Sequence, residues 1–327
     1  MLPDEVTNGL EKQHYLFVGQ HRHAAVKTCQ YAKSSMSGGN ACYKNLFYGI
    51  TSYQCIQGTA NIVCYNNCIY CWRAHPEELG AQDARLQIRQ WDGPETIVDG
   101  FIAAHRKLLS GMGGHDKADR KVWESSRSPK HVALSVLGEP VAYPRITELL
   151  AEFHNRGIST FLVTAGTAPA AIEKMAKGGV LPTQFYLSMG GYDEESYNRF
   201  MKPKVAVGWK NYRKSIKLMS GMKTRRAVRT TLMCGLNMVH PEKWARLILE
   251  TGAEYLEAKA YAAVGYSRQR VGMDHMPRHE EVREFARELE AHTGYIYAAE
   301  HRPSRVVLLC KNQEALENRI IDFSRIH

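Results

Sequence analysis

Six of the eight cysteines in this 327-residue chain lie within its first 71 residues, and their spacing constrains the fold more than any other feature. Three of them form the run C-Y-N-N-C-I-Y-C at 64–71, which follows the short apolar piece 60–63 as a loop follows a strand. Three thiolates on one loop suit three irons of a [4Fe–4S] cube and leave the fourth iron open. The alternative is a structural zinc site completed by a distant ligand such as His75, and it is less favoured because zinc sites usually use paired C-x2-C.

The C-x3-C-x2-C spacing, with Tyr70 just before the last cysteine, resembles the radical S-adenosylmethionine (SAM) superfamily. In that superfamily SAM chelates the open iron and is cleaved to a 5′-deoxyadenosyl radical. Its members also carry a glycine-rich turn at the tip of a second strand, and Gly138-Glu139-Pro140, after the apolar segment 131–136, resembles it. Glycine lets main-chain groups come close to a ligand, so the resemblance implies that Gly138, Glu139 and Pro140 bind SAM.

Short apolar strands alternate with helical stretches along the rest of the chain. We expect strands at 60–63, 131–136, 159–164, 184–188, 227–232 and 255–261, and helices that include 146–156 and 169–177. This repeated βα pattern indicates parallel strands, and the superfamily resemblance makes it an α/β fold, a partial (β/α)6 barrel with its cluster at the carboxyl ends of the strands. The predicted domains are an N-terminal extension at 1–58, the barrel at 59–290 and a C-terminal extension at 291–327.

The other cysteines of the N-terminal region are Cys29, Cys42 and Cys55, which are separated by equal steps of 13 residues. They lie too far apart for one knuckle. On spacing alone they are a second cluster site, a zinc site completed by His21 or His23, or three unrelated buried thiols. Cys234 and Cys310 stand alone far downstream, and we expect both to be small buried residues.

Longer segments resemble one family of the superfamily, the tRNA 4-demethylwyosine synthases in their archaeal-type form. The segments lie at 42–45, 64–73, 259–268, 276–282 and 300–309, within a resemblance that runs from about residue 14 to residue 310. The family implies a carbon–carbon lyase of wyosine biosynthesis. It would add carbons 2 and 3 of pyruvate to N1-methylguanosine at position 37 of phenylalanine tRNA, with SAM and an external one-electron reductant.

The family resemblance also implies roles for site residues. The SAM cluster would lie on Cys64, Cys68 and Cys71, and a second [4Fe–4S] cluster on Cys29, Cys42 and Cys55 would hold pyruvate at its open iron. Lys44 matches the lysine to which the family assigns Schiff-base chemistry, since an amine can capture the ketone of pyruvate as an imine. Without the resemblance, a solvated surface lysine would be the preferred interpretation.

Two strand tips depart from the family pattern. Thr-Ala-Gly at 164–166 replaces Thr-Asn-Gly, so Ala165 offers no amide to SAM, and SAM contacts there must use the backbone or Thr164. Ser-Met-Gly-Gly at 188–191 replaces Ser-Leu-Asp-Ala, which places Met189 after the serine and removes the usual Asp. Ser188 remains an expected SAM contact.

The chain carries a net charge of +10, which favours a polyanionic partner such as nucleic acid. From 199 to 229 there are eleven Lys or Arg and no acid, with Trp209 and Tyr212 available for stacking. The expected tRNA contacts are Lys202, Lys204, Lys210, Arg213 and Lys214. The alternative is a helix at 205–219 whose apolar face covers the barrel and whose basic face is solvated, and both can be true of one helix. The Gly- and Ser-containing stretch 111–130 is expected to be a flexible loop that could close on the anticodon.

No apolar stretch approaches the length of a membrane span, and the acidic start of the chain is unlike a secretory signal. We therefore expect a cytoplasmic protein with thiols rather than disulfides, no membrane partner and a monomeric state. Two other functions remain open. One is a zinc-dependent tRNA-binding protein without catalysis, and the other is a radical SAM enzyme with a different substrate, such as a protein-activating or methylthiolating enzyme.

Overall fold

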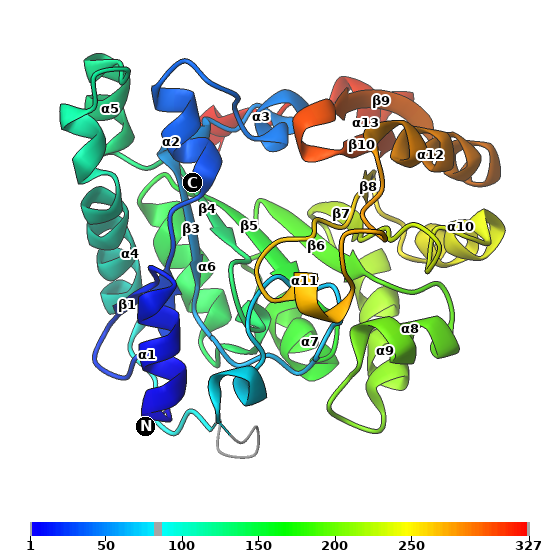
Figure 1. The fold of residues 1–327 in the computed structure, drawn as a ribbon, viewed down its shortest axis with the longest axis horizontal. Coiled ribbons are helices and arrows are strands. Elements are labelled where there is room, and N and C mark those ends of the chain that lie inside the picture. The colour runs from blue at the N-terminus through cyan, green and yellow to red at the C-terminus, as the bar shows by residue number, and fades with distance from the viewer. Residues whose placement is uncertain (1, 82–86, 326–327) are drawn as a thin grey trace.

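The computed structural model describes residues 2–81 and 87–325, and it is built on one sheet of ten strands. The order across the sheet is β1-β2-β3-β4-β5-β6-β7-β8-β10-β9 (Figure 1). The strands are β1 (Leu16–Val18), β2 (Ala24–Val26), β3 (Cys55–Thr59), β4 (His131–Leu134), β5 (Ser159–Thr164), β6 (Gln184–Met189), β7 (Arg225–Thr230), β8 (Tyr255–Lys259), β9 (Ile296–His301) and β10 (Val306–Cys310).

The six central strands, β3 to β8, are parallel to one another, and helices connect them. This arrangement confirms the predicted partial (β/α)6 barrel. Strands β1 and β2 extend one side of the sheet in antiparallel fashion, and β10 and β9 extend the other. Because β1 and β9 are not neighbours in the strand order, the sheet stays open. The predicted boundary at 58/59 falls inside β3, so both extensions contribute strands to the sheet that the barrel forms.

Alternating residues of each central strand face two different cores. On β5, Leu162 packs into the larger core beneath the surrounding helices, whereas Phe161 and Val163 face the smaller core on the inner side of the barrel. Successive side chains of a strand point to opposite faces, so a strand buried on both faces is apolar throughout. The short helix α3 (Tyr43–Tyr48) packs against this inner face, where Phe47 and Tyr48 are fully buried, and ends at Gly49 in the left-handed region (φ 81°).

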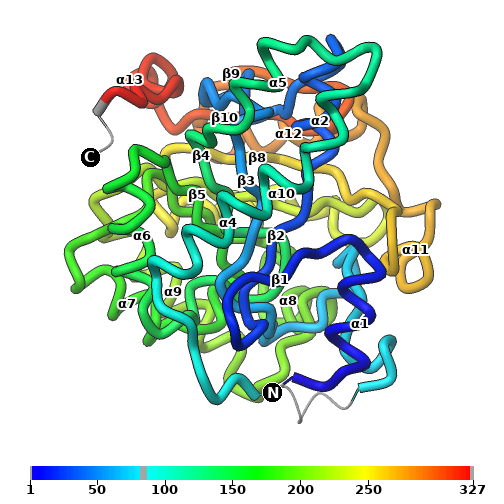
Figure 2. Tube along the Cα trace, turned by 90° about the vertical axis from the view of Figure 1, so that its left-hand side faces the viewer, coloured from blue at the N-terminus to red at the C-terminus, as the bar shows by residue number. Residues whose placement is uncertain are grey.

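Amphipathic helices cover the outer face of the sheet, and their buried sides form the larger core. Figure 2 shows the same layers from the side. The other helices are α1 (Asp4–Lys12), α2 (Gln30–Met36), α4 (Pro94–Leu108), α5 (Arg120–Ser126), α6 (Ile146–Asn155), α7 (Pro169–Lys177), α8 (Glu194–Met201), α9 (Gly208–Ser220), α10 (Pro241–Glu250), α11 (Ser267–Arg270), α12 (His279–Thr293) and α13 (Gln313–Glu317). No helix among the described residues is long and apolar enough to cross a membrane.

The predicted first strand at 60–63 is wrong, because the strand before the cysteine loop is β3 and residues 60–63 are irregular. The side-chain oxygen of Asn61 accepts a hydrogen bond from the Val63 N–H. The backbone carbonyl of Asn61 accepts one from the Thr59 hydroxyl. These bonds turn the backbone out of the sheet. Strand β3 is hard to recognise from the sequence, because Cys55, Gln57 and Thr59 alternate with the residues of its other face and break the apolar run.

The predicted loop at 111–130 is also wrong in part, because it contains α5. Asp119 caps this helix by accepting from the N–H groups of Lys121 (2.8 Å) and Val122 (3.1 Å). Helices α5 and α2 pack together at one end of the molecule (Figures 1 and 2), where Val122 lies against the core around Met36. The segment thus supports the helix that begins after Cys29.

Candidate active site

The cysteine loop and the glycine-rich turn meet at the carboxyl end of the barrel, as predicted. Cys64, Cys68 and Cys71 line one pocket together with Gly138. The loop follows β3 and the turn follows β4, which are parallel neighbours. Adjacent parallel strands end at the same edge of a sheet, and in open α/β sheets that edge is where ligands bind.

Gly138 is required where the turn crosses the segment that leads into the cysteine loop. Its φ is +68°, and a Cβ at this position would lie 1.9 Å from the carbonyl oxygen of Asn61. Two hydrogen bonds lock the crossing: the Glu139 N–H donates to the Val63 carbonyl (2.9 Å), and the Asn61 amide donates to the Glu139 carbonyl (3.1 Å). The sequence predicted that Gly138 lets the backbone come close to SAM. In the structure Gly138 also lets two backbone segments come close to each other.

The side chains expected to bind SAM lie at neighbouring strand tips and are partly engaged with the backbone. The buried Glu139 carboxylate accepts from the Ala165 N–H (2.9 Å), and burial raises its pKa to about 7. The Thr164 hydroxyl accepts from the Gly166 N–H (2.9 Å). Pro140 is buried at the start of a short 3-10 helix, and Ser188 lies near the end of β6. Ala165 thus contributes its backbone N–H to this region. It lacks the side-chain amide of the Asn that the family has at this position.

The three cysteines of the loop are close enough to affect each other electrostatically. Burial raises the pKa of Cys64 to about 11, and Glu139 and Cys71 add to that shift. Burial also raises the pKa of Cys68, and Cys64 and Cys71 contribute to it. Thiols that are costly to ionise on their own become good ligands once iron supplies the positive charge.

The segment 259–271, which begins at the end of the last parallel strand, β8, holds the cysteine loop in place. Arg270 donates to the Cys68 carbonyl (2.9 Å) and forms an ion pair with Glu78 (2.9 Å). Gly265 has φ +56°, and a Cβ there would lie 2.3 Å from the Trp72 carbonyl oxygen. The part of the sequence that resembled the family most specifically therefore positions the predicted cluster ligands.

The second cysteine set also converges, although its members are widely spaced in the sequence. Cys29 and Cys42 precede α2 and α3, and Cys55 begins β3. Burial raises the pKa of Cys42 to about 11 and that of Cys55 to about 12, with Cys29 the next contributor in each case. The three thiols therefore lie near one another in the fold. The alternative zinc ligand His23 has both ring nitrogens engaged, one with the Ala60 carbonyl (2.8 Å) and one with the Asp92 N–H (2.8 Å).

Both cysteine sets offer the donor type of an iron–sulfur cube, three thiols each. Among residues 2–81 and 87–325, no three His, Cys, Asp or Glu side chains form a group that could hold one metal ion. A cube needs a wider arrangement, because each thiolate binds a different iron. Each set presents three neighbouring thiols of that kind.

Lys44 lies in the first turn of α3 and is buried, with 8% of its surface exposed, so the alternative of a solvated lysine is wrong. Its Nζ lies 4.1 Å from the centre of the Tyr186 ring and 5.2 Å from that of Phe161. Burial lowers the pKa of the amine, while nearby Glu257 opposes that shift. Lys44 thus faces the inside of the barrel beside the second cysteine set.

A buried polar cluster around Glu257 was missed from the sequence. Its Oε1 accepts from the hydroxyls of Tyr48 and Tyr186 and its Oε2 from that of Tyr43, each at 2.9 Å. Lys259 donates to the Ser304 carbonyl (2.9 Å), and burial lowers its pKa to about 8. The available signal was a charged residue in the middle of a predicted strand, because such a residue is buried only where partners exist.

The residues expected to contact tRNA lie on several elements around the cysteine loop and α9. Lys204 lines the pocket of the cysteine loop, while Arg213 forms an ion pair with Glu250 (2.6 Å). Lys202 ends α8 and Lys210 is exposed on α9. The prediction that Tyr212 is available for stacking is wrong, because it lies on the buried face of α9 and is fully buried. The alternative of an apolar helix face is therefore confirmed, and the opposite face stays available to a partner.

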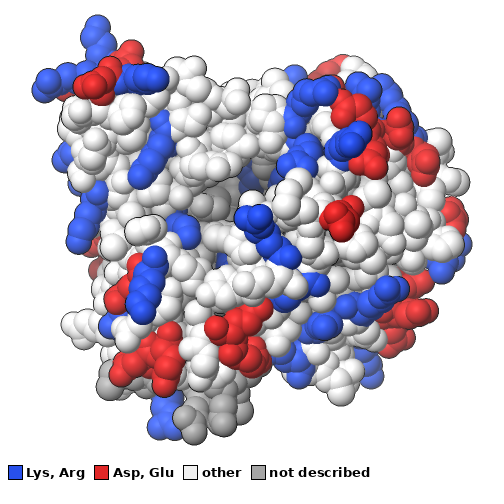
Figure 3. Space-filling model, viewed as in Figure 1, with Lys and Arg blue, Asp and Glu red and all other residues white. Residues whose placement is uncertain are grey.

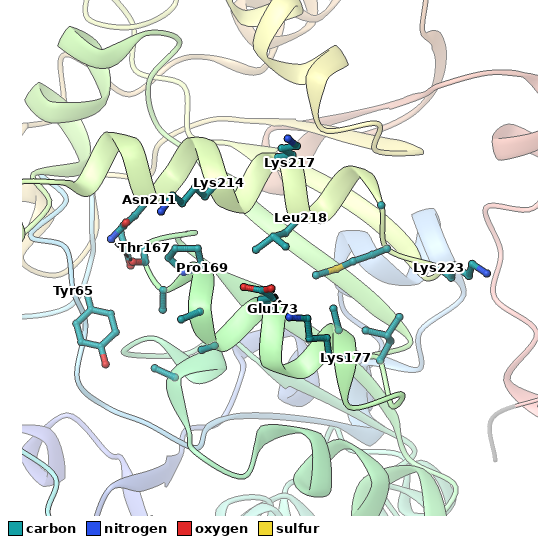
Figure 4. A pocket seen from close by; sticks show the side chains of 18 of the residues that line it. Tyr65, Thr167, Pro169, Glu173, Lys177, Asn211, Lys214, Lys217, Leu218 and Lys223 are labelled. Atoms are coloured by element: carbon teal, nitrogen blue, oxygen red, sulfur yellow. Dashed lines mark hydrogen bonds and ion pairs between the residues drawn. The ribbon is translucent and has the colours of Figure 1, made fainter.

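Lys214 lies in a groove between α7 and α9 (Figure 4). Lys217 and Lys223 also line this groove, and its one acid, Glu173, forms an ion pair with Lys177 (2.6 Å). Tyr65, directly after Cys64, lines the same groove. Figure 3 shows that Lys and Arg side chains also surround a hollow on the face of Figure 1.

The remaining predictions on isolated residues have mixed outcomes. Cys310 is fully buried, as expected. The prediction that Cys234 is buried is wrong, because it is half-buried and its thiol lies 3.5 Å from a Glu281 carboxylate oxygen. The partly exposed thiol of Cys234 therefore has a polar partner, the carboxylate of Glu281.

Comparisons with known proteins agree with this site. The model of the radical SAM superfamily matches residues 62–248, and that of wyosine base formation matches residues 250–311. The S-adenosyl-L-methionine-dependent tRNA 4-demethylwyosine synthase of Pyrococcus abyssi is 45% identical over 313 residues, which cover 95% of this chain and 90% of that protein. The synthase of Methanocaldococcus jannaschii is 34% identical over 311 residues, or 94% of this chain and 96% of that protein.

Two solved structures share the whole fold. The structure of TYW1 with a lysine–pyruvate adduct bound is 32% identical, covers 99% of both chains and has a TM-score of 0.84. The crystal structure of archaeal TYW1 is 30% identical, also covers 99% of both chains and has a TM-score of 0.76. The chain belongs to the tRNA 4-demethylwyosine synthase family, whose members are radical SAM enzymes of wyosine biosynthesis.

Proposed function

We propose that this enzyme uses two [4Fe–4S] clusters and one lysine to build 4-demethylwyosine from pyruvate and N1-methylguanosine at position 37 of phenylalanine tRNA. SAM would bind at Cys64, Cys68 and Cys71, and the second cluster would lie on the other cysteine set. The observation that carries the proposal is the position of Lys44, which faces the barrel interior beside that second set. A related structure with a lysine–pyruvate adduct supports the same use of Lys44.

Cys64, Cys68 and Cys71 would hold the cluster, and the cluster with SAM would supply the radical chemistry that activates the N1-methyl group. The residues of this chain do the positioning. The turn at Gly138, Glu139 and Pro140, with Thr164 and Ser188 at the next strand tips, would hold SAM above the barrel. Lys44 holds pyruvate by attack of Nζ on the ketone carbon with loss of water, and Phe161 and Tyr186 shield the imine from hydrolysis.

The basic side chains that flank the cysteine loop support a tRNA-binding role. Lys204 lies at the cluster pocket, and Lys214 and Lys217 lie in the groove that starts at Tyr65. Lys202, Lys210 and Arg213 extend this set along α8 and α9. Phosphate contacts of this kind bind the tRNA backbone and leave the recognition of guanosine 37 to the barrel interior. We also propose that the enzyme acts as a cytoplasmic monomer with an external one-electron reductant.

The decisive experiment is an anaerobic reaction of the reconstituted enzyme with SAM, pyruvate, dithionite and tRNA that carries N1-methylguanosine. We expect nucleoside mass spectrometry to detect 4-demethylwyosine, and its formation to require pyruvate. The matched control is Cys234→Ala, which removes a thiol outside both sets, while Cys68→Ala should abolish both 5′-deoxyadenosine and product. Product formation by Cys68→Ala, or none by the wild type under these conditions, would overturn the proposal.

A further inference from the structure

Arg73 follows the last cysteine of the loop by two residues, and it lines the same pocket as the three cysteines and Gly138. Its Nη1 donates to the sulfur of Cys71 at 4.0 Å, and its Nη2 donates to the carbonyl of Ser135 (2.6 Å), directly after β4. The Cζ atom of Arg73 lies 4.9 Å from the centre of the Trp72 ring. The guanidinium is therefore held against one sulfur atom of the expected cluster.

The positive charge of Arg73 has no counter-charge in this part of the fold. Arg270, which also holds the cysteine loop, forms an ion pair with Glu78 (2.9 Å), whereas no carboxylate among residues 2–81 and 87–325 forms one with Arg73. The Nε of Arg73 is buried and has no hydrogen-bond partner among these residues. A cation that is partly withdrawn from water favours an anion beside it. The sulfur of Cys71 would become that anion, because a cysteine loses its proton when it binds iron.

A cation at this position affects how readily the cluster accepts an electron. A [4Fe–4S] cube on three thiolates is anionic, and its reduction adds a further negative charge. A cation in contact with a ligating sulfur stabilises the reduced cluster more than the oxidised cluster, because the attraction grows with the charge on the cluster. Hydrogen bonds to the ligating sulfurs also set the reduction potential. Arg73 combines the charge and the hydrogen bond in one side chain, so both effects favour reduction.

We propose that Arg73 raises the reduction potential of the cluster that binds SAM, by donating a charged hydrogen bond to the thiolate of Cys71. The inference rests on the proposed function, which places that cluster on the cysteine loop. In this step one electron passes from the external reductant to the cube, and no bond forms or breaks. Arg73 acts through Cys71, so it is a positioning residue. SAM carries a carboxylate that a guanidinium could also bind, and the proposal commits to the cluster because Nη1 already donates to Cys71 and Nη2 to Ser135.

A redox titration of the reconstituted enzyme tests the proposal. The enzyme is poised without oxygen and without SAM at a series of potentials set by dithionite and mediators, and electron paramagnetic resonance measures the reduced cluster. A second set of samples contains SAM and identifies the signal of the cysteine-loop cluster, because that signal should change when SAM binds. A purely structural role of Arg73 would leave the ratio of reduced to oxidised cluster unchanged at each potential.

In Arg73→Met, the ratio of reduced to oxidised cluster at a fixed potential should fall about tenfold, the value of a charged hydrogen bond, which corresponds to a midpoint about 59 mV more negative. Arg73→Gln keeps N–H groups without the charge and should shift the ratio in the same direction, which provides a second test if Arg73→Met does not retain iron. The matched control is Lys27→Met, which removes a cation 5.1 Å from the centre of the same Trp72 ring. The Lys27 amine donates to the Gln13 carbonyl (2.7 Å), so this variant should titrate close to the wild type.

The outcomes distinguish the inference from the function on which it rests. Equal titrations of the wild type and the Arg73 variants, at the same iron content, would overturn the role of Arg73 alone, and so would an equally large shift in Lys27→Met. Weaker binding of SAM to Arg73→Met in equilibrium dialysis, with an unchanged redox titration, would assign the guanidinium to the SAM carboxylate and also overturn it. A wild-type enzyme without a cluster signal that responds to SAM would overturn both proposals.

Discussion

Replacing Gly138 with alanine tests whether the glycine-rich turn is specified by backbone contact. Two costs add at this position. The left-handed φ of +68° costs a residue with a Cβ about 1 to 2 kcal/mol. The new Cβ would also lie 1.9 Å from the Asn61 carbonyl oxygen, so the two segments must separate by more than an ångström.

That separation breaks the two hydrogen bonds that lock the crossing, from the Glu139 N–H to the Val63 carbonyl and from the Asn61 amide to the Glu139 carbonyl. At about 1 kcal/mol each, their loss adds about 2 kcal/mol to the cost of the φ angle. If the displaced turn is the one that holds SAM, the same 2 kcal/mol corresponds to roughly 30-fold weaker binding of SAM.

Gly157→Ala is the matched control, because Gly157 has φ +67° and nothing within 4 Å of a Cβ at its position. Both variants carry the cost of the φ angle, and only Gly138→Ala carries the steric cost. The assays are anaerobic urea unfolding and equilibrium dialysis of SAM on reconstituted enzyme. We expect Gly157→Ala to lose stability modestly and to bind SAM normally. Equal stability and equal SAM affinity in the two variants would refute the reasoning.

Four further predictions address the clusters, the lysine, the histidines and the tRNA surface. Anaerobic reconstitution should yield about eight irons per chain in a brown protein, and Cys29→Ala should remove about four, whereas a zinc protein would be colourless. Lys44→Ala should lose the borohydride adduct and 4-demethylwyosine while 5′-deoxyadenosine still forms, and normal product would return Lys44 to a structural role. Burial lowers the pKa of His105 to about 4, so the unfolded chain binds the extra proton first as the pH falls. The free energy of unfolding should therefore drop by up to about 3 kcal/mol between pH 6.5 and pH 4, a slope that urea titrations should find missing in His105→Gln. Reversing Lys210 and Lys214 to Glu should weaken tRNA binding and flatten its salt dependence without affecting SAM cleavage, and an unchanged salt titration would limit both residues to a solvated helix face.

The sequence by itself determined the elements whose signals are local. Strand β5 and helix α7 have the bounds predicted for them, because a continuous apolar run and an amphipathic period are properties of neighbouring residues. The cysteine loop is equally local, since three ligands within eight positions can be recognised without knowing what lies around them. The family resemblance extended this to Lys44, whose own neighbours in the sequence do not distinguish it from a surface lysine.

Only the tertiary structure decided which distant residues share the interior of the barrel. The convergence of Cys29, Cys42 and Cys55 depends on how α2, α3 and β3 cross, and no spacing rule encodes that crossing. The cluster of Glu257 and Arg229 depends on strand register, because a shift of one residue would turn either side chain to the opposite face. A local pattern indicates which apolar residues face the core, whereas the partners of a residue are set by the packing of elements that the chain brings together from far apart.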